Sequence, residues 1–156
     1  MQTILVPLDG SARAEQVLPH VAYLARKLSA GVRLLRVVPE PLYDIPVLQD
    51  VAAGDRVAAR VYTPLPEPSP VESLRARATD ETRPAVLALR SQGLDVELDV
   101  EVGDPAERIV EVAAEQRVSM IAMATHGYGG VRRWALGSVT DKVIQAAPVP
   151  VYVIRS

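Results

Sequence analysis

Apolar residues along this chain occur in short unbroken runs that alternate with stretches of helical spacing. The first run, residues 3–8, is apolar at nearly every position, which is typical of a strand buried on both faces, as in a parallel sheet. From Ser11 to Leu28 apolar residues recur every three or four positions and predict a helix, with Pro19 producing a kink or a later start. A second apolar run, residues 32–38, completes a strand-helix-strand unit.

The second half of the chain repeats this alternation. Helical spacing returns over residues 72–92, and residues 94–102 alternate apolar with acidic side chains, as a strand with one solvated face does. We therefore place that strand near an edge of the sheet. Asp104 followed by Pro105 is a strong helix start, because aspartate caps and proline fits the first helical position. Further patterns predict a strand at 118–123, a helix at 138–147 that buries Val139, Val143 and Ile144, and a strand at 149–154.

This order of elements predicts the fold class. It is that of an α/β protein with an open, doubly wound, five-stranded, mostly parallel sheet and four helices, similar to a Rossmann fold. A length of 156 residues suits one domain, residues 1–156. Residues 39–71 hold more than half of the prolines and show no sustained period, so we expect a long Pro-rich surface loop there.

Charge and composition narrow the function. With 17 Lys+Arg against 19 Asp+Glu, the net charge of −2 gives no general attraction to nucleic acid or anionic lipid. The absence of cysteine excludes disulfides and thiolate catalysis. No apolar stretch is long enough for a membrane span, and the N-terminus has no export signal. We expect a soluble, cytoplasmic protein whose partner is a small ligand or another protein.

The strongest candidate for chemistry lies after the strand at 118–123. Residues 127–130 hold three glycines, and Gly137 and Ser138 stand directly before a predicted helix. Backbone N–H groups at a helix start, together with the helix dipole, form an anion site. Glycines alone are equally typical of turns. The spacings of a P-loop and of a dinucleotide-binding G-x-G-x-x-G loop are absent, which disfavours a P-loop NTPase and a NAD dehydrogenase.

Four segments taken together resemble the universal stress protein family. They are residues 4–11, 103–105, 123–127 and 136–140, and the likeness extends to the final Val-Pro-Val strand, so it covers essentially the whole chain. ATP-binding members carry G-x2-G-x9-G followed by Ser or Thr. This chain keeps that spacing from Ala124 through Gly127 to Gly137 and Ser138, with alanine in place of the first glycine. Alanine still permits close backbone approach but resists a positive φ.

The resemblance implies an ATP site and assigns its residues. The adenosine side would be lined by Pro7, Leu8, Asp9 and the main chain of Val37, and the floor would be formed by Met123 and Ala124. The phosphates would be cradled by Gly127, Gly137, Ser138, Val139 and Thr140, with Mg²⁺ or Mn²⁺ bound through the phosphates. The residues themselves leave a second interpretation open for Asp9, which at a strand end also suits a turn or cap.

Three further polar residues have two interpretations each. His126 could act as a base, but His20 is the only other histidine and no Ser-His-Asp order is present, so we favour a spacer role. Arg132 and Arg133 suit either a clamp on the γ-phosphate or a solvated loop face.

Three functions compete. The leading one is an ATP-binding regulatory or stress-response module with at most slow hydrolysis. The alternatives are a nucleotide hydrolase or transferase that uses Asp9 or His126 with Mg²⁺, and a protein-interaction domain with a vestigial pocket. The apolar C-terminal strand, residues 149–154, predicts a homodimer, because an edge strand invites pairing with its own copy; the family resemblance implies the same interface. The sequence names no protein partner.

Overall fold

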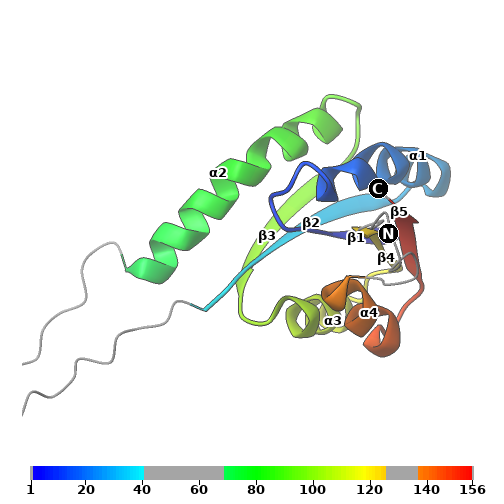
Figure 1. Cartoon of the computed structure of the whole chain (residues 1–156). Coiled ribbons are helices and arrows are strands. Elements are labelled where there is room, and N and C mark those ends of the chain that lie inside the picture. The colour runs from blue at the N-terminus through cyan, green and yellow to red at the C-terminus, as the bar shows by residue number, and fades with distance from the viewer. Residues whose placement is uncertain (1, 41–68, 126–136, 156) are drawn as a thin grey trace, which may run out of the picture.

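The computed structural model describes residues 2–40, 69–125 and 137–155. These ranges form five strands, four α-helices and a short 3₁₀-helix, η1 (Figure 1). In chain order the elements are β1 (Thr3–Leu8), η1 (Ala14–Val17), α1 (Leu18–Leu28), β2 (Gly31–Val38), α2 (Pro70–Arg90), β3 (Val96–Val102), α3 (Pro105–Glu115), β4 (Met120–Thr125), α4 (Ser138–Ala146) and β5 (Val151–Arg155). The predicted fold class is confirmed. The predicted Pro-rich loop lies almost entirely outside the described residues.

The sheet has the strand order β3-β2-β1-β4-β5, and all four strand pairings are parallel. The chain winds outward from the central β1 to β3 and then crosses to β4 on the other side of β1. The direction of winding therefore reverses between β1 and β4, which is where parallel sheets of this kind bind ligands. β3 and β5 are the two edges, as the sequence predicts.

Helices cover both faces of the sheet, with α1 and α2 on one face and α3 and α4 on the other (Figure 1). Successive side chains of β1 enter opposite cores. Ile4 and Val6 pack in the cluster that contains residues of α1 and α2, whereas Leu5 packs in the cluster that contains residues of α3 and α4. All three are fully buried. The unbroken apolar runs therefore belong to strands buried on both faces, as expected.

The first two helices start at places set by proline and serine. The α-helical part of the 11–28 segment begins only at Leu18, with Pro19 in its first turn, which is the later start that the proline allows. α2 begins before the predicted Glu72. The Ser69 hydroxyl accepts from the Glu72 N–H, and the Glu72 carboxylate accepts from the Ser69 N–H. This reciprocal capping box fixes the start of α2.

One side-chain position and the starts of three strands differ from the prediction; β3 begins at Val96 rather than Leu94, and β5 begins at Val151 rather than Val149. Ile144 is 42% exposed rather than inward, because Thr140 and Val143 already form the buried stripe of α4 and Ile144 lies about 100° further round the helix. The fourth strand begins at Met120 rather than Val118, since the Val118 N–H bonds to the Ala113 carbonyl in the turn after α3.

Among the described residues, no helix combines the length and the apolar character that a membrane crossing requires.

Candidate functional site

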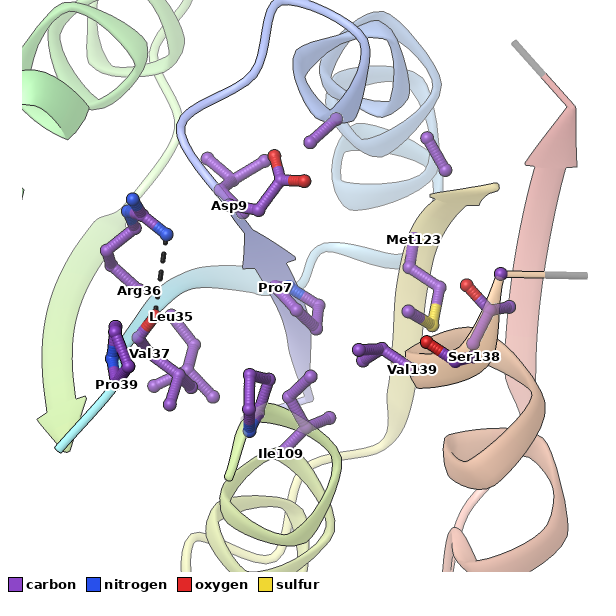
Figure 2. Close-up of a pocket in the computed structure, with 16 residues that line it drawn as sticks. Pro7, Asp9, Leu35, Arg36, Val37, Pro39, Ile109, Met123, Ser138 and Val139 are labelled. Atoms are coloured by element: carbon purple, nitrogen blue, oxygen red, sulfur yellow. Dashed lines mark hydrogen bonds between the residues drawn. The ribbon is translucent and has the colours of Figure 1, made fainter. Parts of the chain in front are cut away.

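A cavity of about 670 Å³ lies at the carboxyl ends of β1, β2 and β4 (Figure 2). Its volume falls within the roughly 300–1,000 Å³ usual for small-molecule sites. Every predicted site residue except Gly127 lines it; these residues are Pro7, Leu8, Asp9, Val37, Met123, Ala124, Gly137, Ser138, Val139 and Thr140. Gly127 lies outside the described residues. The cavity therefore brings together side chains from distant parts of the chain at the point where the winding of the sheet reverses.

Six lining residues were missed by the sequence interpretation. They are Ala14, Leu35, Arg36, Pro39, Pro105 and Ile109. Leu35 and Ile109 also belong to the core cluster that contains residues of α3 and α4. Arg36 is a charged residue near the carboxyl end of β2, the end at which parallel sheets bind ligands, and that position is the signal that could have found it.

The loop after β1 shows that Asp9 has the predicted turn role, and Asp9 also lies at the cavity. The Ser11 N–H donates to Asp9 Oδ1 at 2.9 Å, and the Ala14 N–H donates to Ser11 Oγ at 3.1 Å. Gly10 between them has a φ of +83°, which glycine adopts without strain. Asp9 therefore organises the turn, and it also lines the cavity. The turn holds the carboxylate in a fixed place.

Asp9 and Arg36 form the charged corner of the cavity. Partial desolvation on its own would raise the pKa of Asp9, but hydrogen bonds from Ser11 and the nearby Arg36 guanidinium outweigh it and lower the pKa below its usual value. The Arg36 side chain is 17% exposed, and its Nη2 lies 3.8 Å from a Glu81 carboxylate oxygen of α2. A Cβ added at Gly10 would lie 3.1 Å from Arg36 Nη2. The guanidinium is thus packed closely against the β1 loop.

The N-terminus of α4 lines the opposite end of the cavity. Gly137 is its N-cap and has no side chain with which to cap the helix. At α3, by contrast, the N-cap Asp104 accepts from the N–H groups of Ala106 and Glu107. The first-turn donors of α4 therefore receive no hydrogen bond from their own N-cap residue, and the helix dipole makes this end favourable for an anion.

Ala124, the residue that departs from the glycine pattern, lies within β4 and pairs in register with Ile154 of β5. Among the described residues, the non-glycine positions with positive φ are Ser29 and Arg117. Alanine at position 124 therefore has an ordinary strand conformation, and the expected conflict with a positive φ does not arise at this position.

The model of the universal stress protein family matches residues 1–155. The chain belongs to the universal stress protein family. It is 30% identical to universal stress protein MJ0577 of Methanocaldococcus jannaschii over 159 residues, covering 97% of this chain and 93% of that protein. It is 27% identical to universal stress protein YxiE of Bacillus subtilis over 156 residues, covering 97% of each.

Solved structures agree with this placement. The structure of MJ0577 has a TM-score of 0.72 to this universal stress protein at 27% identity, covering 99% of this chain and 96% of that one. UspA from Lactobacillus plantarum has a TM-score of 0.71 at 24% identity, covering 99% and 97%. The second likeness shows the fold alone.

The other polar candidates lie outside the described residues. This holds for His126, Arg132 and Arg133 as well as for Gly127. Within the described ranges no group of three or more histidine or acidic side chains is arranged to hold a metal ion.

Proposed function

We propose that this universal stress protein binds ATP in the cavity and acts as a regulatory, stress-response module. One observation carries the proposal: a single cavity joins an apolar compartment at the ends of β1 and β2 to the N-terminus of α4, whose N-cap is a glycine. An adenine ring needs the first surface and a polyphosphate needs the second. The two lie apart in the close-up, with Val37 and Ile109 on one side and Ser138 on the other (Figure 2).

The adenosine half would use buried apolar side chains and one charge. Val37 and Ile109 are at most 7% exposed and line the cavity, so they offer a dry surface to a flat ring. Met123 and Ala124 would form the floor. The main chain of Val37 would border the adenine. The Asp9 carboxylate, whose pKa is lowered, is ionised at neutral pH and acts as a hydrogen-bond acceptor. Ribose hydroxyls are the donors that suit it.

The phosphate half would use the start of α4. Gly137 has no side chain to block close approach, and the Ser138 and Thr140 side chains line the cavity with hydroxyl donors. Val139 contributes its backbone N–H at the same end. Bonds from such donors to a charged oxygen are stronger than bonds between neutral groups. Mg²⁺ or Mn²⁺, held through the phosphate oxygens, would neutralise part of their negative charge.

Structures of related fold are described with adenine nucleotides. A universal stress protein in complex with cAMP has a TM-score of 0.59 at 19% identity, and one from Archaeoglobus fulgidus in complex with dAMP has a TM-score of 0.65 at 24% identity. At these identities the likeness is one of fold alone. They support an adenine nucleotide as the class of ligand, while the triphosphate rests on the α4 N-terminus of this chain.

The described residues favour a binding module over a rapid hydrolase. Asp9 is the carboxylate that lines the cavity, and Figure 2 places it away from Ser138 at the α4 end. Its Oδ1 already accepts a hydrogen bond from the Ser11 N–H. A general base for hydrolysis would have to lie within hydrogen-bond reach of the water that attacks the phosphates.

We also propose a homodimer formed through β5. Because ATP is an intracellular ligand, we propose a cytoplasmic location.

Three measurements on freshly purified protein test the proposal. Mass analysis of released small molecules should identify ATP. Calorimetric titration should give a higher affinity for ATP than for adenosine or tripolyphosphate, because ATP engages both halves of the cavity. Phosphate release should stay far below one turnover per second. A protein that carries no nucleotide and does not respond to Mg-ATP would instead be a protein-interaction domain, and rapid turnover would make it a hydrolase.

A further inference from the structure

A side chain at the end of β4 contacts the start of α4. Thr125, the last residue of β4, is 1% exposed, and its Oγ1 accepts a hydrogen bond from the Gly137 N–H at 3.2 Å. We propose that Thr125 is a positioning residue, which holds the α4 N-terminus where its N–H groups meet the nucleotide phosphates. This inference rests on the proposed ATP site.

The start of α4 needs such support. The helix has nine residues, and its N-cap, Gly137, offers no side chain to cap the first turn. Its Val143 is fully buried in the core, whereas its first turn lies at the rim of the cavity, and helix ends are the parts that open most easily. Hydrogen bonds weaken steeply when donor and acceptor are misaligned. The phosphate affinity of a site made of backbone N–H groups therefore depends on how accurately the helix end is positioned.

Thr125 comes from a well-anchored element. β4 lies between β1 and β5, and Thr125 itself pairs in register with Arg155. Its hydroxyl reaches toward a residue twelve positions later in the chain. The bond therefore holds Gly137, the N-cap of α4, in a fixed position relative to the sheet. It does so without occupying the N–H groups of Ser138 and Val139.

Substitutions at Thr125 separate the hydrogen bond from packing. Thr125→Val keeps the shape but removes the acceptor, and leaves the Gly137 N–H without this partner. Thr125→Ser keeps the acceptor and removes a methyl group. Thr82→Val is a matched control, because Thr82 is 3% exposed and its hydroxyl donates to the Ala78 carbonyl at 2.8 Å inside α2. It applies the same chemical change to an equally buried threonine outside the cavity.

The experiment measures the affinities of each variant for ATP and for adenosine. For Thr125→Val we expect ATP affinity to fall about tenfold, equivalent to ~1.4 kcal/mol, while adenosine affinity stays within about twofold. Thr125→Ser and Thr82→Val should keep the wild-type ratio of the two affinities. A merely structural role would lower both affinities together, or would lower stability without changing their ratio.

The outcomes separate this inference from the proposed function. If wild-type protein shows no preference for ATP over adenosine, the phosphate site itself is wrong. If wild-type shows that preference and Thr125→Val keeps it, Thr125 does not position the site. Should Thr125→Val fail to fold, hydrogen exchange of the wild-type Gly137 amide decides the matter: the inference expects it protected in the ligand-free protein, and exchange at the rate of an unfolded chain overturns the inference.

Discussion

At the scale of single residues, Asp9 links folding to pH. Its pKa is lowered in the folded protein by Ser11 and Arg36, despite partial desolvation, so the ionised form stabilises the fold. This contribution is present above the pKa of the unfolded chain, about 3.9, and is lost as the pH falls through the lower folded value.

Asp9→Asn should therefore lower stability at pH 7 more than at pH 3. Because Asp9 is exposed, the difference at pH 7 should be small, less than ~1 kcal/mol. Urea unfolding of the two proteins at both pH values measures it. A stability difference that does not shrink in acid would show that the carboxylate charge has no part in holding the loop.

Gly137 and Ser138 test the phosphate end directly. A branched side chain in Gly137→Val would crowd a phosphate at the helix start, so ATP binding should be lost while the domain still folds. Ser138→Ala removes one hydrogen bond to a charged oxygen, worth about 1.5–3 kcal/mol, and should weaken binding roughly ten- to hundredfold. Ser91→Ala, at the exposed C-cap of α2, is the control. If calorimetric titrations show that Gly137→Val and Ser138→Ala bind ATP with the same affinity as the control, the phosphates do not bind at the start of α4.

Site residues that belong to a local sequence motif could be predicted from the sequence. Residues whose role depends on contacts between distant segments could not. Asp9 and Gly137 stand at recognisable strand and helix ends. Thr125 is one threonine among several until the fold sets it against Gly137, twelve residues away. Arg36 faces Asp9 only because β2 pairs with β1. Ala124 shows the reverse case, since its departure from the motif costs no strain within β4.

At the scale of elements, the two edge strands differ in whether side chains occupy their outward backbone groups. On β3, Arg90 donates to the Val96 carbonyl from Nη2 at 2.6 Å and from Nε at 3.2 Å, and Arg75 donates to the Val100 carbonyl. Asp95 directs its carbonyl to Val32 of β2, so by alternation Val96 and Val100 direct theirs to the open edge. Arginines of α2 thus occupy acceptors that a neighbouring strand would need.

Arg90→Ala should open this edge. It removes two bonds to the Val96 carbonyl, so we expect a loss of ~1 kcal/mol in stability and a greater tendency to aggregate on heating. Arg83→Ala is the control, because Arg83 pairs with Asp80 on the surface of the same helix. Light scattering during a thermal ramp compares them, and equal aggregation of the two variants would show that Arg90 does not protect the edge.

The elements themselves were largely predictable, because each apolar run or helical spacing is a local property. Their ends were less so. Ser69 caps α2 from within a Pro-rich stretch that has no period, and the start of β4 moved because Val118 is used in a turn. Neither contact can be predicted from the spacing of apolar residues in the sequence.

At the scale of the whole molecule, β5 is the edge that stays available. Pro150 directs its carbonyl to Ile121 of β4, so by alternation Val151 and Val153 direct their backbone groups away from the sheet. The donor that Pro150 lacks therefore falls on the β4 side and leaves this edge intact. Within the described parts of the chain no further strand pairs with β5, and the side chains of Val151 and Val153 are only partly buried.

A second copy of the chain is the partner that suits this edge, because a two-fold axis allows β5 to pair with itself. We predict that light scattering at micromolar concentration gives twice the chain mass of 16.8 kDa. Val153→Lys should yield a folded monomer, since the Val153 side chain packs only in part against the α3 and α4 core and a lysine there can extend its charge into water. Leu87→Lys is the control, because Leu87 is 57% exposed on α2, and α2 packs on β3 and β2, at the other side of the sheet from β5; that variant should stay dimeric. A monomeric wild type would rule out the β5 dimer, and dissociation by both lysine variants would place the interface elsewhere.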